Sequence, residues 1–256
     1  MKYLLSILLV FWASNSIAMT ILIDPGHGGE DDGAVHSENI KSKEVVTKEK
    51  DLSLQISNRI YEILSKKYSV FLTRSVDRTV SLPERALIAE KVKADLFISV
   101  HINSSPDSRS VGFETYYLDN NNDVAVKKVE KTENIQNKGE EVVQQILVDL
   151  VVEQTVSTSK PLAASIHSEV RKKLSGKYGI QSRGIKPGLF YVLALSKRPG
   201  VLLEVGFIST QKERLRMQNP KFQEDYARAV SEGIEKYLNN NINKKIIHKK
   251  KIRKHH

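Results

Sequence analysis

Apolar residues recur along the chain with two different spacings, and each spacing predicts one kind of element. Short runs rich in branched apolar residues, bounded by turn-forming residues, are typical of buried strands. Such runs predict strands at residues 20–23, 68–73, 96–100, 112–118, 189–194 and 201–206. Stretches in which apolar residues return every three or four positions predict amphipathic helices. These helices are expected at residues 48–66, 82–94, 161–174 and 220–238.

The order of these elements predicts a single α/β domain at residues 19–238. Its first half alternates strand, helix, strand, helix, strand, which implies parallel strands joined by right-handed crossovers. We therefore expect a twisted, mostly parallel sheet with helices on both faces. Residues 30–47 are expected to form a polar loop. A segment rich in Asn, Lys, Glu and Gln, about residues 119–160, interrupts the pattern as a helical insert with candidate helices at 123–134 and 142–150.

The two ends of the chain differ from this domain. Residues 1–18 combine Lys2, an apolar run and the small-x-small sequence at Ser16 to Ala18, which predicts a cleaved secretory signal peptide. The apolar run is too short to span a bilayer stably, although an uncleaved anchor stays open as an alternative. Residues 239–256 contain an Asn-rich stretch followed by seven Lys or Arg and no acid, which predicts a disordered basic tail.

Charge and cysteine content narrow the function further. The basic tail supplies most of the formal net charge of +10. It is either a solvated segment or one that binds anionic surfaces of the cell envelope, and an exported protein is not expected to bind nucleic acid. Because the chain has no cysteine, stability must come from the core or from a metal. Any metal ligands must then be His, Asp or Glu.

Three residues are placed for chemistry. His27 follows a predicted strand directly, in a turn whose glycines let a ligand or metal approach the backbone. His101 follows the strand at 96–100, so both imidazoles are expected at the edge where parallel strands end. Glu204 lies within an apolar strand, and a buried carboxylate must be paired or coordinated. A salt bridge to a Lys or Arg is one reading of Glu204, and a role in a metal site is the other.

Two histidines, one carboxylate and an open fourth position form the ligand set of a hydrolytic zinc site, to which a second carboxylate adds the base. Glu44 and Glu49 both follow the His27 turn and could supply the ligand. Glu49 is favoured because it begins a predicted helix, which leaves Glu204 as the base. Glu114 is expected to be structural. The remaining histidines are expected at the surface rather than in the site: His36, His167, His248, His255 and His256.

Several motifs in this order resemble the catalytic domain of the zinc-dependent N-acetylmuramoyl-L-alanine amidases, over about residues 20–238. They are D-P-G-H-G-G at 24–29, K-E-K-D at 48–51, L-T-R at 72–74, S-L-P-E-R-A at 81–86, A-D-L-F-I-S-V-H-I-N at 94–103, G-F-E-T-Y-Y-L at 112–118 and P-G-V-L-L-E-V-G-F-I-S at 199–209. The resemblance implies one Zn²⁺ per chain held by His27, Glu49 and His101, with Glu204 as the catalytic residue. It also implies a peptidoglycan substrate, cleaved between N-acetylmuramic acid and L-alanine of the stem peptide.

The insert resembles that of the division-linked periplasmic amidases, through Glu133-Asn134 and I-L-V-D-L at 146–150. In that subgroup the matching helix blocks the active site until a protein activator displaces it. The resemblance therefore implies an exported enzyme of cell-wall remodelling and daughter-cell separation, with Glu133 as an autoinhibitory metal contact. Two alternatives stay open: a zinc peptidase acting on stem peptides, and a non-catalytic cell-wall-binding protein.

Overall fold

The computed structural model describes residues 19–40, 42–119, 127, 131, 133 and 141–252. The predicted signal peptide and most of residues 120–140 lie outside the described residues. The strands are β1 (Thr20–Pro25), β2 (Val35–Ile40), β3 (Lys43–Lys48), β4 (Ser69–Leu72), β5 (Leu96–Asn103), β6 (Phe113–Leu118), β7 (Ser182–Gly188) and β8 (Gly200–Phe207). The helices are α1 (Glu49–Leu64), α2 (Leu82–Lys91), α4 (Glu141–Tyr178), α5 (Tyr191–Ser196), α6 (Gln211–Gln218) and α7 (Pro220–Ile252).

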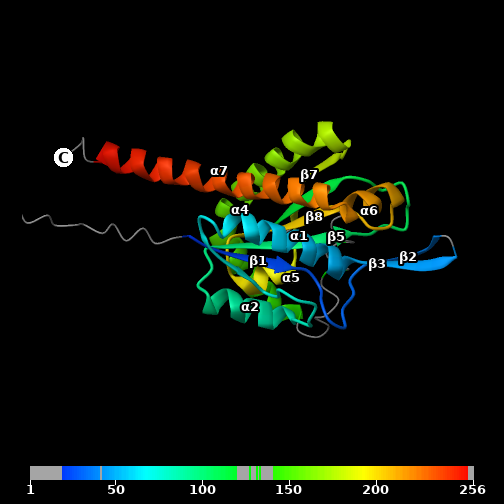
Figure 1. The fold of residues 1–256 in the computed structure, drawn as a ribbon. Helices are drawn as coiled ribbons and strands as arrows, with labels where there is room; N and C mark the ends of the chain where they lie inside the picture. Colours follow the sequence, from blue (N-terminus) through cyan, green and yellow to red (C-terminus); the bar gives the residue numbers. More distant parts are fainter. Residues whose placement is uncertain are drawn as a thin grey trace, which may run out of the picture.

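Six strands form the central sheet in the order β4-β1-β5-β8-β6-β7. Neighbouring strands are parallel except where β6 runs antiparallel to β8. Helices α1 and α7 and the C-terminal part of α4 cover one face (Figure 1). Helices α2 and α5 cover the other face, where Val148 and Val151 from the N-terminal part of α4 also pack. The predicted α/β class, with a mostly parallel sheet between two helical layers, is confirmed. Among the described residues, no helix has the length and apolarity needed to cross a membrane.

The alternation of side chains along the central strands assigns each residue to one of the two faces. In β8, Val201, Leu203 and Val205 pack beneath α1, α4 and α7, whereas Leu202 points toward α5. All eight residues of β5 and all eight of β8 are buried, as expected for parallel strands covered on both faces. By the same alternation, Glu204 lies on the face of α2 and α5.

Two predictions for the irregular segments are wrong. Residues 30–47 are not only a loop, because β2 and β3 pair there as an antiparallel hairpin that projects from the domain (Figure 1). The hairpin lies outside the core, so its strands carry little of the apolar signal from which strands are predicted. The helix expected to start at Pro161 starts twenty residues earlier, at Glu141, and runs through the proline. Burial on both sides of Pro161, by Val151 and Ile166, outweighs the lost hydrogen bond.

Two further boundaries differ toward the end of the chain. Residues 189–194, predicted as a strand, overlap helix α5, and the strand is β7 just before it. A short apolar run does not distinguish strand from buried helix, and β7 is an edge strand in which glycine and proline are tolerated. Helix α7 continues to Ile252, into the tail predicted as disordered from residue 239. Lysine is a good helix former, and a helix already nucleated by packing extends easily. Helix α6 was not predicted.

Helices α4 and α7 cross at Gly233, where the backbones approach too closely for a side chain. A Cβ added to Gly233 would lie 2.5 Å from Ile166 Cα, and Ser165 Oγ donates a hydrogen bond of 2.7 Å to the Gly233 carbonyl. Because both partners are backbone atoms of a packed helix, the contact cannot be relieved by rotating a side chain. The crossing therefore requires glycine at this position.

We predict that Gly233→Ala lowers the free energy of unfolding by about 1–3 kcal/mol, the usual cost of overpacking. The matched control is Gly176→Ala in α4, where an added Cβ meets nothing within 4 Å. This control is expected to raise stability by about 0.5–1 kcal/mol, since alanine is the better helix former. Urea unfolding of both variants measures the difference. Equal effects at the two positions would contradict the close crossing.

Candidate metal centre

The turn that carries His27 is held in a strained conformation by two buried arginines. His27 has a φ of 58°, which costs a non-glycine residue about 1–3 kcal/mol. Arg85 donates hydrogen bonds of 2.8 Å to the carbonyls of Pro25 and His27, and Arg74 donates one of 2.7 Å to that of Gly26. The turn therefore keeps its shape because its carbonyls are bound from outside the turn.

Asp24 balances the charge of Arg85 beneath this turn. Its carboxylate pairs with the Arg85 guanidinium and accepts hydrogen bonds from Thr73 Oγ1 at 2.6 Å and Ser99 Oγ at 2.8 Å. Burial alone would raise the pKa of Asp24, but Arg85 and the two hydroxyls bring this pKa below its ordinary value. Asp24 thus stays charged in the core and fixes Arg85 against the turn.

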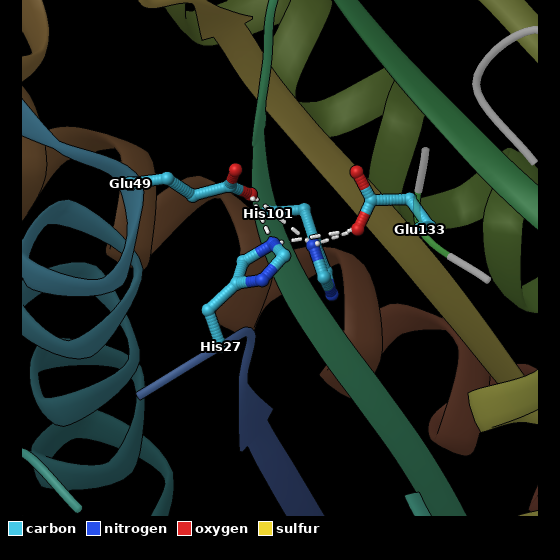
Figure 2. Close-up of side chains that lie close together, drawn as sticks. All are labelled: His27, Glu49, His101 and Glu133. Carbon is cyan, nitrogen blue, oxygen red and sulfur yellow. Dashed lines mark hydrogen bonds and ion pairs between the residues drawn. The ribbon is translucent and has the colours of Figure 1, made fainter. Parts of the chain in front are cut away.

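Four side chains converge beside the turn (Figure 2). His27 comes from the loop after β1, Glu49 from the first turn of α1, His101 from β5, and Glu133 from a helical residue of the predicted insert. One ligand atom from each lies within 4.8 Å of the other three. Glu49 Oε1 is 3.2 Å from both His27 Nε2 and His101 Nδ1, and Glu133 Oε2 is 3.4 Å and 2.7 Å from the same two nitrogens.

These four atoms fit a tetrahedral zinc ion. Ligand bonds of about 2.0–2.1 Å in a tetrahedron separate the ligand atoms by roughly 3.3 Å, close to most of the separations observed. His27 Nε2 and Glu133 Oε2 are both buried and lie 3.4 Å apart, each facing the other ligand atoms of the cluster. The space is kept open by glycine, because a Cβ on Gly26 would lie 2.6 Å from His101 Nε2 and one on Gly33 would lie 2.7 Å from Glu49 Oε2.

The electrostatic field at this centre favours a cation. Burial lowers the pKa of the His101 imidazole, but Glu133 and Glu49 outweigh it and raise this pKa to about 10. Burial likewise opposes protonation of His27, and Glu49 together with Asp31 raises its pKa well above the ordinary value. The same surplus of negative charge would stabilise a bound metal ion.

Neighbouring groups orient the ligands. Asp31 Oδ2 lies 2.9 Å from His27 Nδ1, the nitrogen that faces away from the centre, as in carboxylate–histidine–metal triads. Both oxygens of Glu49 accept backbone hydrogen bonds of 2.8 Å, from the amides of Ile102 and Ala34. Sequence reasoning missed Asp31, although its position four residues after His27 in the glycine-rich turn was an available signal.

Glu204 lies beside the four converging atoms without joining them. It is opposite His101 in the register of β5 and β8 and opposite Glu114 in the register of β6 and β8, so the three side chains form one row. Its side chain is buried, and neither carboxylate oxygen has a hydrogen-bond partner among the described residues. Burial, followed by the charge of Glu133, raises the pKa of Glu204 well above its ordinary value. No described Lys or Arg forms the salt bridge considered for Glu204.

The other candidate residues lie elsewhere. Glu44 is exposed on the projecting hairpin, paired across it with Asn39. His36 is half-buried on the same hairpin. His167 is not a surface residue: it lies behind the sheet within 3.0 Å of Thr115 Oγ1 and 2.6 Å of Ser182 Oγ, and burial lowers its pKa to about 4. The three tail histidines lie among side chains that the structure does not describe.

The site lies at the carboxyl ends of parallel strands, and it combines a His/Glu ligand set with an adjacent buried acid. These features define a metal-dependent hydrolase on an α/β scaffold. The family can then be identified. A family model described as N-acetylmuramoyl-L-alanine amidase matches residues 21–236, and the chain belongs to this family, Amidase_3.

Individual relatives agree with this assignment. AmiC of Escherichia coli O6:H1 is 29% identical over 231 residues, which cover 86% of this chain and 53% of that protein. AmiA of Escherichia coli K12 is 30% identical over 243 residues, covering 90% of this chain and 80% of AmiA. The chain therefore spans only about half the length of some curated relatives. The catalytic domain of CwlV from Bacillus (Paenibacillus) polymyxa var. colistinus superposes with a TM-score of 0.63 at 32% identity, over 86% of this chain and 98% of that domain.

We predict that Asp31→Asn weakens zinc binding by about 10–100-fold, because the substitution removes the charge that orients and polarises His27. Competition with a chromophoric chelator measures the dissociation constant. Asp107→Asn is the control, since Asp107 is an exposed loop carboxylate paired with Arg109. An unchanged affinity in Asp31→Asn would show that Asp31 does not support a metal ligand.

Proposed function

We propose that this chain is a zinc-dependent amidase that hydrolyses the bond between the lactyl group of N-acetylmuramic acid and L-alanine of the peptidoglycan stem peptide. The observation that supports this most is the convergence of four ligand atoms within 4.8 Å, beside the unpaired carboxylate of Glu204. The names of the family and of AmiA and AmiC supply the substrate class. We assign His27, Glu49 and His101 as the resident ligands.

In this proposal each part of the site has a separate task. A zinc ion supplies a positive charge that acidifies water and polarises a carbonyl oxygen. Glu204 accepts the proton of the attacking water and returns it to the departing amine of L-alanine. A raised pKa suits this residue, because a group that both takes and gives a proton works best when its pKa is near the working pH.

The reaction products distinguish amidase from the two alternatives. Purified peptidoglycan is digested, and the new ends are identified by mass spectrometry. Free amino termini of L-alanine are expected for an amidase. Cuts within the stem peptide would instead identify a peptidase, and binding without cuts would identify a cell-wall-binding protein.

We predict that Glu204→Gln lowers the turnover rate in this assay by about 10²–10⁴-fold, the usual contribution of a general acid–base group. Zinc content should stay at one ion per chain, as measured by elemental analysis. Glutamine keeps the size of the side chain but cannot carry the proton. Loss of zinc from this variant would make Glu204 a ligand and overturn the assignment.

We further infer that Glu133 holds the enzyme in an inhibited state. Its carboxylate is buried and lies within 3.4 Å of both histidine nitrogens, in the position that a water molecule or the substrate carbonyl must occupy. Lys127 and Lys131, from the same segment, are exposed. Of these three described residues of the segment, Glu133 is the one directed into the site, and a protein activator that displaces it would free the fourth position.

We predict that Glu133→Ala raises amidase activity by about 5–150-fold, the range of 1–3 kcal/mol typical of regulatory coupling. Lys131→Ala is the matched control from the same segment and should leave activity unchanged. Deleting the whole predicted insert is a poorer test, because Val148 and Val151 of α4 belong to the core. Equal activity in wild type and Glu133→Ala would contradict autoinhibition.

Location and cellular role follow from the same proposal. Residues 1–18 are proposed to direct export, and the enzyme would act on the cell wall in the periplasm or cell envelope during daughter-cell separation. The basic residues from 244 onward are proposed to contact anionic envelope surfaces. Helix α7 carries residues 244–252 of this segment and extends away from the sheet (Figure 1).

A further inference from the structure

A pocket of about 160 Å³ joins the metal centre to a second cluster of charged residues. Glu49 and Glu133 line the end that belongs to the metal centre. Glu114, Arg183 and Lys186 line the other wall, and the proposed reaction has no use for these three residues. One end of the pocket therefore carries ligands for a cation, and the other end carries two cations.

Glu114 fixes both cations in place. Its Oε1 accepts hydrogen bonds from Arg183 Nε at 2.6 Å and Lys186 Nζ at 2.7 Å. Its Oε2 accepts from the Tyr116 hydroxyl at 2.6 Å and from Asn103 Nδ2 at 3.1 Å. Burial raises the pKa of Glu114, but Lys186 and the other donors bring it below the ordinary value, so the carboxylate stays charged. With four donors, Glu114 has no remaining site for a ligand, and one unit of positive charge is left over.

The two cations keep hydrogen-bonding capacity for a ligand. Arg183 lies over the ring of Phe207, with Cζ 5.2 Å from its centre, and Lys186 Nζ lies 5.9 Å from the centre of the Tyr116 ring. Their side chains are 40% and 25% exposed, while that of Glu114 is 2% exposed. A guanidinium has five N–H donors and an ammonium has three, so neither is used up by the bonds to Glu114. Such a pair, oriented by a buried acid and by aromatic rings, is preorganised for an anion.

We propose that Arg183 and Lys186 bind a carboxylate of the substrate's stem peptide and so orient the scissile amide toward the metal centre. This inference rests on the proposed function, because the peptide supplies the carboxylate. The charge distribution favours this occupant, because Arg183 and Lys186 together carry one unit of positive charge beyond the negative charge of Glu114. Arg183 and Lys186 are then specificity-determining residues, and Glu114 is the residue that positions them.

The test compares two substrates in the Glu133→Ala background, in which the fourth position is free. One is a muramoyl peptide with free carboxylates, and the other is the same compound with every peptide carboxylate converted to an amide. Lys186→Met and Arg183→Met should each raise KM for the free acid by about tenfold or more, because a hydrogen bond to a charged group is lost. Turnover at saturation should stay the same. The amidated compound should already have a higher KM with the Glu133→Ala enzyme. Lys186→Met and Arg183→Met should raise that KM by less than about twofold.

Arg109→Met is the matched control, because Arg109 is an exposed cation that pairs with Asp107 in the loop after β5. It should leave KM for both substrates unchanged. Equal losses for the acid and the amide in the Arg183 and Lys186 variants would overturn the carboxylate assignment, as would an unchanged KM. Thermal unfolding of each variant separates loss of binding from loss of fold.

A binding measurement separates this proposal from the proposed function. The free stem tripeptide and its amidated form are titrated into the Glu133→Ala protein and into the Arg183→Met and Lys186→Met variants in the same background, with affinity measured by calorimetry. Preference for the free acid in Glu133→Ala, lost in the two variants, supports the subsite even if no peptidoglycan is cleaved. Cleavage without that preference would leave the amidase proposal in place and refute the subsite.

Discussion

The buried ion pair between Asp24 and Arg85 is the interaction on which the metal centre depends. Arg85 binds the carbonyls of Pro25 and His27, so it holds a turn that is strained at His27 itself. An arginine buried without a counterion would be costly, and Asp24 supplies that counterion at the end of β1. Because the pair is enclosed by the sheet and α2, the placement of His27 depends on the packing of the domain.

The register of the sheet fixes the remaining groups. His101, Glu204 and Glu114 stand in one row across β5, β8 and β6, on the face of α2 and α5. The three buried side chains differ in their surroundings: His101 faces the other ligands, Glu114 accepts four hydrogen bonds, and burial raises the pKa of Glu204 above its ordinary value. A slip of one residue in β8 would turn Glu204 to the opposite face, so the strand pairing defines the site as much as the residues do.

The sequence predicts the site where a functional residue interrupts a local apolar pattern. Glu204 is an acid within an apolar run, and His101 directly follows the apolar run at 96–100. The strand nevertheless continues to Asn103, because polar residues at a strand end interrupt the apolar signal without ending the pairing. The β2–β3 hairpin, the course of α4 through Pro161 and the helical state of residues 191–196 depend on packing between distant segments, which no local pattern contains. The grouping of Glu114 with Arg183 and Lys186 is likewise a product of the β6–β7 pairing.

The proposed inhibition and the proposed substrate subsite share one pocket. Glu133 and the cation pair both line it, so in these proposals the Glu133 carboxylate and a peptide carboxylate are not independent ligands. Glu133 points at His27 and His101, where it would take the position needed by the scissile carbonyl and add negative charge that opposes an acidic peptide. Its departure would remove both obstacles together. A single displaced side chain would thereby raise substrate affinity as well as the availability of the metal, which makes inhibition by this segment tighter than steric blocking alone would give.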